Sequence, residues 1–259
     1  MDLGISGRTA IVCGASAGLG RASALALSRE GVRVYLAART DDRLRAAAKA
    51  ISDETGVEAV PVACDVTTED GRSALLSACP DPDILINNAG GPPPGDFRNW
   101  SREDWLKAID ANMLSAIFLI RDTIDGMIAR SFGRVVNITS HMVKQPLNIL
   151  GLSNGARAGL TGFIGGLARE VAGHNVVLNN VLPGQFDTDR LRSNQERFAA
   201  ASGSEVGAFR ERQRNQIPAR RFGDPAEFGD LCAFLCSARA GFITGQNFLL
   251  DGGQYPGLL

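Results

Sequence analysis

Three glycines near the amino terminus have the spacing of a phosphate-binding turn. Gly14, Gly18 and Gly20 follow a short apolar run and open a segment of helical periodicity. A missing Cβ allows the tight turn, the close approach of a pyrophosphate to the backbone, and the packing of a helix on a strand. The exposed N–H groups and the positive helix end attract phosphate. Glycines also mark ordinary loops, but this position between strand and helix favours a dinucleotide site.

The residue at the tip of the second predicted strand discriminates between the two nicotinamide cofactors. A carboxylate there binds a free ribose 2′-hydroxyl, whereas a cation accommodates a 2′-phosphate. The tip carries Arg39 and no carboxylate, and a guanidinium can make a forked contact to phosphate. The alternative is a solvated arginine that begins the next helix. We therefore expect NADP(H) rather than NAD(H).

The elements that must position these residues alternate between short β-rich runs and longer helical segments, as in βαβ units around a parallel sheet. Near-continuous apolar runs in two of the strands suit a sheet covered on both faces. We predict a single domain over residues 1–259, of the α/β class, with a Rossmann-type doubly wound parallel sheet of about seven strands in three layers. The predicted strands are residues 9–13, 32–38, 59–64, 84–87, 133–139, 176–182 and 247–250, and the predicted helices are residues 18–30, 41–55, 68–78, 102–130, 154–172 and 225–237.

Residues 186–221, here named the lid segment, interrupt this alternation. The segment is rich in Arg, Gln, Ser and Ala, and long insertions in a compact domain are usually functional lids or partly disordered. We predict a substrate lid that is helical in part. Its many arginines would suit an acidic carrier protein or a coenzyme A phosphate. The alternative is a solvated helix pair with internal ion pairs.

Composition and net charge argue against several classes of binding partner. The net charge of -1 and the absence of a basic stretch argue against a nucleic-acid ligand. No apolar stretch reaches membrane-spanning length and no signal sequence is present, so we expect a cytoplasmic protein that does not bind a membrane. The five cysteines contain no Cys-x-x-Cys pair, which predicts buried thiols, with neither a disulfide framework nor a metal site.

Several separated motifs resemble the short-chain dehydrogenase/reductase family. They are the glycine spacing, the run Asn87-Asn88-Ala89-Gly90 after the fourth predicted strand, and the tail that ends in Asp251-Gly252-Gly253. The likeness spans nearly the whole chain, and the 3-oxoacyl-acyl-carrier-protein reductases look most similar. The resemblance implies a cofactor-binding set of Gly14, Ser16, Gly18, Leu19, Gly20, Arg39, Asp65, Val66, Asn88, Ala89, Gly90, Arg157, Pro183, Gly184 and Thr188.

The catalytic pattern departs from that family. Its members use a Tyr as proton donor to the carbonyl, a Lys four residues later that lowers the Tyr pKa, and a Ser thirteen residues before the Tyr. Ser140 matches this Ser and Asn112 matches the Asn of the catalytic tetrad, but Ser153 and Arg157 occupy the Tyr and Lys positions. No replacement tyrosine lies nearby in the sequence. The resemblance therefore implies the altered catalytic set Asn112, Ser140, Ser153 and Arg157.

These replacements weaken acid catalysis. An aliphatic hydroxyl is a far weaker acid than a phenol, whose pKa is about 10. Loss of general acid catalysis costs ~10²- to 10⁴-fold in rate, whereas Arg157 keeps a positive charge for the ribose hydroxyls with a different geometry. His141 could offer an imidazole acid and Lys144 a cation; the alternatives are a lining or surface role for His141 and a solvated Lys144.

Two functions are compatible with this pattern. The first is an NADP(H)-dependent oxidoreductase that acts on a carbonyl/alcohol pair, with a small molecule or a 3-oxoacyl thioester as substrate. The second is a catalytically impaired pseudoenzyme that senses NADP(H) or serves as an assembly subunit. The predicted helices 102–130 and 154–172 resemble the pair through which family members associate, so a homodimer or homotetramer is expected.

Overall fold

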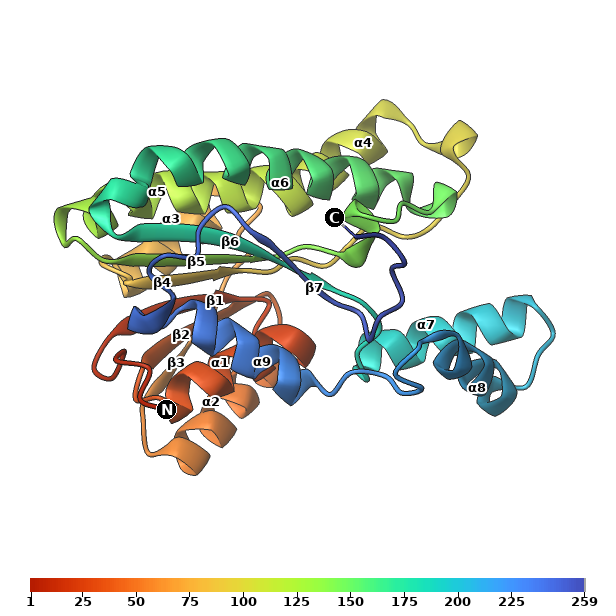
Figure 1. Cartoon of the computed structure of the whole chain (residues 1–259), viewed down its shortest axis with the longest axis horizontal. Helices are drawn as coiled ribbons and strands as arrows, with labels where there is room; N and C mark the ends of the chain where they lie inside the picture. The colour runs from red at the N-terminus through yellow and green to blue at the C-terminus, as the bar shows by residue number, and fades with distance from the viewer. Residues whose placement is uncertain (259) are drawn as a thin grey trace.

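A wholly parallel seven-stranded sheet runs through the molecule in the computed structural model, which describes residues 1–258 (Figure 1). The strand order is β3-β2-β1-β4-β5-β6-β7, so the winding direction reverses between β1 and β4. In such a sheet the ligand crevice lies at the carboxyl ends of the strands beside this switch point. The strands are β1 Thr9–Cys13, β2 Arg33–Ala38, β3 Ala59–Ala63, β4 Ile84–Asn87, β5 Gly133–Ile138, β6 Val176–Pro183 and β7 Asn247–Leu250.

Helices cover both faces of the sheet and enclose two hydrophobic clusters (Figure 1). One cluster contains Leu27, Leu44 and Phe228 from helices on one face. The other contains Leu119 and Leu160 from helices on the opposite face. The first layer is α1 Gly18–Arg29, α2 Asp41–Thr55 and α9 Pro225–Leu235, and the second is α3 Glu69–Ala78, α4 Arg102–Ile109, α5 Ser115–Ala129 and α6 Gly151–Val171. The predicted three-layer fold is confirmed.

The predicted helix boundaries are correct to within three residues, with one difference in continuity. The predicted helix over residues 102–130 is divided into α4 and α5 by a π-helical turn at Asp110–Leu114. Such turns occur frequently at functional sites. This one contains Asn112, which the resemblance assigns to the catalytic set.

The lid segment forms two helices, α7 Asp189–Ala201 and α8 Val206–Gln216, at one end of the molecule (Figure 1). Gln195 Nε2 of α7 donates to Gln213 Oε1 of α8 over 2.8 Å. Several of its arginines form ion pairs nearby, as the alternative reading expects, because Arg192 and Arg210 both contact Asp187. The role of the segment as a substrate lid stays a prediction.

A row of asparagine amides crosses four neighbouring strands. Asn87 Nδ2 of β4 donates to Asn137 Oδ1 of β5 over 2.9 Å, and Asn137 Nδ2 donates to Asn180 Oδ1 of β6 over 3.2 Å. Asn180 Nδ2 then donates to Asn247 Oδ1 of β7 over 2.9 Å. Each donor and acceptor are direct partners in the strand register. The row therefore links the C-terminal strand to the centre of the sheet.

Within residues 1–258, no helix has both the length and the apolar character needed to span a bilayer. The same residues contain no group of His, Cys, Asp and Glu side chains that could hold a metal ion. The five cysteines are free thiols, and four of them are buried.

Candidate active site

The glycine-rich turn leaves the amino end of α1 open to a ligand. Gly14 and Gly18 have φ of +59° and +57°, a backbone conformation that favours glycine. A Cβ on Gly14 would lie 2.6 Å from Asn88 Nδ2, and one on Gly20 would overlap the carbonyl oxygen of Gly14. Ala17, at the N-cap, offers no side-chain hydrogen bond to the first turn. The uncapped N–H groups can therefore bind an anion.

The other residues of the predicted cofactor set mostly follow the carboxyl ends of the strands. Exposed Arg39 follows β2, Asp65 and Val66 follow β3, Asn88, Ala89 and Gly90 follow β4, and Pro183 and Gly184 lie at the end of β6. Thr188 lies over the turn, since a Cβ on Gly18 would lie 3.5 Å from its Cγ2. Ser16 lines a cavity with Thr188, whereas Leu19 packs against the hydrophobic core.

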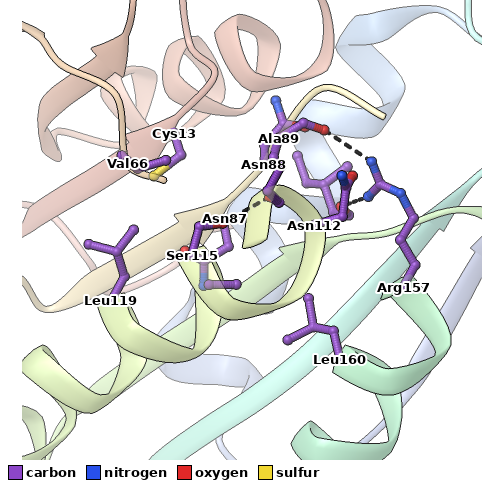
Figure 2. A pocket seen from close by; sticks show the side chains of 13 residues that line it. Cys13, Val66, Asn87, Asn88, Ala89, Asn112, Ser115, Leu119, Arg157 and Leu160 are labelled. Atoms are coloured by element: carbon purple, nitrogen blue, oxygen red, sulfur yellow. Dashed lines mark hydrogen bonds between the residues drawn. The ribbon is translucent and has the colours of Figure 1, made fainter. Parts of the chain in front are cut away.

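Arg157 is buried and braces two strand ends. Its Nη1 donates to Ile138 O over 2.9 Å, and its Nη2 donates to Ala89 O over 3.0 Å (Figure 2). Its Nε donates to Ser153 Oγ over 3.3 Å. A guanidinium has five N–H donors, so two remain for a ligand. Burial, followed by the charge of Arg190, lowers the Arg157 pKa to about 10.

The three remaining members of the predicted catalytic set lie in different local structures. Ser153 is half-buried in the first turn of α6. Ser140 follows β5, and its Oγ accepts from the N–H of Met142 over 3.2 Å. Asn112, in the π-helical turn, is 4% exposed, and its Nδ2 donates to Ala108 O over 3.3 Å.

A small cavity, whose walls are mostly apolar, lies beside Arg157. Its volume is about 20 Å³, and Asn87, Asn112, Ser115 and Arg157 contribute to its walls (Figure 2). The Oδ1 atoms of Asn87 and Asn112 are buried and accept no hydrogen bond within residues 1–258. A cavity of this size accommodates one water-sized donor. Asn87 also ends the asparagine row, so this row reaches the back of the site.

His141 is a buried residue, and its surroundings favour the neutral imidazole. Its Nδ1 lies 2.9 Å from Pro183 O, and a carbonyl oxygen can only accept, so Nδ1 carries the proton. Burial lowers the His141 pKa and outweighs the opposing effects of the Pro183 hydrogen bond and Asp251. Lys144 does not point freely into solvent, because its Nζ lies 5.8 Å from the centre of the Tyr255 ring. The structure thus places His141 in the interior, which excludes the surface alternative.

Arg190, whose role at the site sequence reasoning missed, reaches the loop after β4 from α7. Its Nη2 donates to Gly91 O over 3.2 Å. A Cβ on Gly91 would lie 3.1 Å from Arg190 Nη2, 3.7 Å from Arg157 Nη2 and 3.8 Å from Ser153 Oγ. Two cations and a hydroxyl therefore converge at this glycine. Such a group of donors can stabilise an anion or a developing oxyanion.

A cleft of about 1230 Å³ opens beside these groups. It extends from Arg39 past Gly90 and Asn112 to α7 and α8, so it joins the cofactor edge to the lid segment. The signal that sequence reasoning overlooked is the helical spacing of Arg190, Asn194 and Arg197, which places them on one face of α7.

Residues 14–254 match the family model described as Enoyl-(Acyl carrier protein) reductase. The 3-oxoacyl-[acyl-carrier-protein] reductase FabG of Aquifex aeolicus is 31% identical, over 98% of this chain and 100% of that protein. Acetoacetyl-CoA reductase of Cupriavidus necator is 33% identical, over 96% of this chain and 99% of that protein. The crystal structure of L-sorbose reductase from Gluconobacter frateurii, complexed with NADPH and L-sorbose, has a TM-score of 0.94 at 32% identity and covers 100% of both chains.

Proposed function

The chain belongs to the short-chain dehydrogenase/reductase family, and we propose that it is an NADP(H)-dependent oxidoreductase acting on a carbonyl/alcohol pair. The observation that carries this proposal is the convergence of the phosphate-binding turn, Arg39 and the Ser153–Arg157 pair on one edge of the sheet. The full-length similarity to carbonyl reductases and to a structure complexed with NADPH supports it.

The residues present fit the cofactor. The turn around Gly14 and Gly18, with the uncapped end of α1, would bind the diphosphate. Arg39 forms no ion pair with a carboxylate within residues 1–258 and would bind the 2′-phosphate. Asp65 with Val66 would lie near the adenine, and Gly184 with Thr188 near the nicotinamide amide. When bound, NADP(H) supplies or accepts the hydride.

Ser153 and Arg157 would act as a unit on the substrate oxygen. Because Ser153 Oγ accepts a hydrogen bond from Arg157 Nε, its own proton is available to that oxygen. As hydride reaches the carbonyl carbon, Ser153 would donate its proton to the carbonyl oxygen, and solvent would then reprotonate Ser153. Arg190 and Ser140 would stabilise the negative charge that develops. Asn112 would position Arg157 from the wall of the small cavity.

A 3-oxoacyl thioester is the substrate class that the named relatives favour. The FabG of Aquifex aeolicus is named for 3-oxoacyl groups on a carrier protein, and the Cupriavidus necator relative for acetoacetyl-CoA. The comparisons give no support to the alternative of a pseudoenzyme that binds NADP(H) without turnover. The experiment described next distinguishes that alternative from a reductase.

The test is a fluorescence titration with NADPH and NADH, followed by 3-oxoacyl thioesters and simple ketones in the same cuvette. We expect tighter binding of NADPH and substrate-dependent oxidation. If NADPH binds but no substrate of the panel causes its oxidation, the proposal of a reductase is refuted in favour of a sensor or assembly subunit. Failure to bind either nucleotide would overturn the proposal as a whole.

We also propose a homodimer or homotetramer that associates through α4–α5 and α6. Phe163 of α6 and Trp105 of α4 are each 37% exposed, and such an assembly would cover them. Light scattering after size exclusion should give two or four chains for the native protein. Phe163→Asp should shift the distribution toward monomer; a native monomer would refute this assembly.

A further inference from the structure

Two helix faces oppose each other across the cleft. On one wall lie Asp104, Lys107 and Ala108 of α4, which recur at helical spacing, and Ala111 of the π-helical turn that follows. On the other wall, the α7 face is formed by Arg190, Asn194, Arg197, Phe198 and Ala201. Figure 1 shows these helices on opposite sides of the same end of the molecule. A ligand in the cleft would therefore contact both.

The charge of the lining is strongly biased. Its charged side chains are four cations and a single carboxylate, Asp104, whose Oδ2 accepts from the N–H and hydroxyl of Ser101 in the capping box of α4. No ion pair within residues 1–258 joins any of the four cations to a carboxylate. Arg192, on the same helix, is by contrast paired with Asp187 and Asp189. The cations of this cleft are Arg39, Lys107, Arg190 and Arg197.

Two of these cations remain unexplained by the proposed reaction. Arg39 belongs to the cofactor edge, and Arg190 meets Arg157 at Gly91. Lys107 and Arg197 are exposed on the two opposing walls. The surface around them is apolar and includes Trp100, Leu147, Ile149, Leu150 and Phe198. Unpaired cations beside apolar walls fit a ligand with an apolar body and an anionic group.

We propose that Lys107 and Arg197 bind an anionic group, a carboxylate or a phosphate, on the carbonyl substrate. The inference rests on the proposed function, whose site it deepens. Arg197 follows Arg190 by seven residues, which corresponds to about 10 Å along α7. The anionic group is thus bound well away from the reacting carbonyl. It belongs to the far end of an acyl chain or to the phosphate-bearing arm of a thioester.

Equilibrium binding to the NADP⁺-loaded protein tests this without turnover, because a ketone and the oxidised cofactor do not react. One arm compares 9-oxodecanoate, whose extended chain matches the separation of Arg190 and Arg197, with its methyl ester by calorimetry. The other compares the 3-oxobutanoyl thioester of 4′-phosphopantetheine with that of pantetheine, which differs from it only in lacking the phosphate. We expect the anionic member of at least one pair to bind ~10- to 100-fold tighter, as for a charge-assisted hydrogen bond. The arm that responds identifies the carboxylate or the phosphate.

Substitutions then test whether Lys107 and Arg197 cause the preference for the anionic probe. In Lys107→Gln and Arg197→Gln the anionic probe should lose most of its advantage while the neutral probe keeps its Kd. Arg192→Gln, on the same helix but outside the cleft, is the matched control and should keep the preference. Equal affinity within both pairs, or a preference that survives the Lys107→Gln/Arg197→Gln double variant, overturns the inference.

The proposed function and the role of Lys107 and Arg197 can be refuted independently of each other. Failure of NADP⁺ to bind, or of NADPH to be oxidised, would count against the reductase, whereas the probe comparison does not depend on turnover. Efficient reduction of neutral and anionic ketones alike would preserve the reductase and refute the role of Lys107 and Arg197.

Discussion

Arg157 Nε donates a hydrogen bond to Ser153 Oγ over 3.3 Å, one turn away on α6. Because the guanidinium also bonds Ala89 O and Ile138 O, the serine is tied to the ends of two strands. The two residues that the resemblance assigns to the family's Tyr and Lys positions are therefore one connected unit. Neither can be changed without altering the hydrogen bonds of the other.

Restoring the family pair should accelerate the reaction. In the Ser153→Tyr/Arg157→Lys double variant a phenol and an ammonium replace the hydroxyl and guanidinium. We expect kcat/KM for reduction of a ketone panel with NADPH to rise by ~10²- to 10⁴-fold, the usual contribution of a general acid. Each single variant, measured alongside, should gain much less. A folded double variant that binds NADPH but is no faster would contradict this prediction.

Arg157 should stabilise the fold as well as the site. In Arg157→Gln the shorter side chain cannot reach both Ala89 O and Ile138 O, so buried acceptors lose their donors. We expect the free energy of unfolding, measured in urea, to fall by ~2–4 kcal/mol. Arg169→Gln, at an exposed position of the same helix, serves as control. Similar losses in the two variants would argue against the bracing role.

Arg39 should determine the choice of cofactor. Arg39→Gln removes the cation proposed for the 2′-phosphate, and a charge-assisted contact of this kind contributes ~1.5–3 kcal/mol. NADPH should then bind ~10- to 100-fold more weakly, with the Kd for NADH unchanged. Arg45→Gln, which removes an exposed arginine of α2 paired with Asp41, should change neither Kd. If Arg39→Gln raised the Kd for NADPH and for NADH by the same factor, the contact of Arg39 with the 2′-phosphate would be contradicted.

His141 should make the fold sensitive to acid. Burial lowers its pKa in the folded protein below the ordinary 6.5, so the unfolded chain binds its proton more readily. The neutral His141 contributes fully to the free energy of unfolding above pH 6.5, and this contribution is lost as pH falls through the pKa of the folded state. Because one proton is involved, the free energy of unfolding changes by no more than ~1.4 kcal/mol per pH unit. His141→Gln should flatten this slope in urea unfolding measured across that range. His174→Gln, at an exposed position, should keep it; an unchanged slope in both variants would exclude His141 as its source.

The sequence was informative where local pattern determines structure. Periodicity located the strands and helices, and the spacing of Gly14, Gly18 and Gly20 placed the phosphate-binding turn after β1. It could not show the division of α4 from α5, because the π-helical turn at Asn112 has ordinary helical residues. The cleft around the predicted site could not be predicted from the sequence for a different reason. Arg190 and Lys107 line the same cleft only because the tertiary fold places α7 and α4 on opposite walls of it.

The asparagine row has a consequence for how the sheet assembles. A side chain in a strand changes face when its register shifts by one residue, so a slip of β6 would move Asn180 away from Asn137 and Asn247 together. Three buried or part-buried amide contacts would then lose partners at once. Since an amide without a partner is costly in the interior, misaligned strands are penalised during folding. The row thus favours the native strand register in the half of the sheet that carries the proposed catalytic residues.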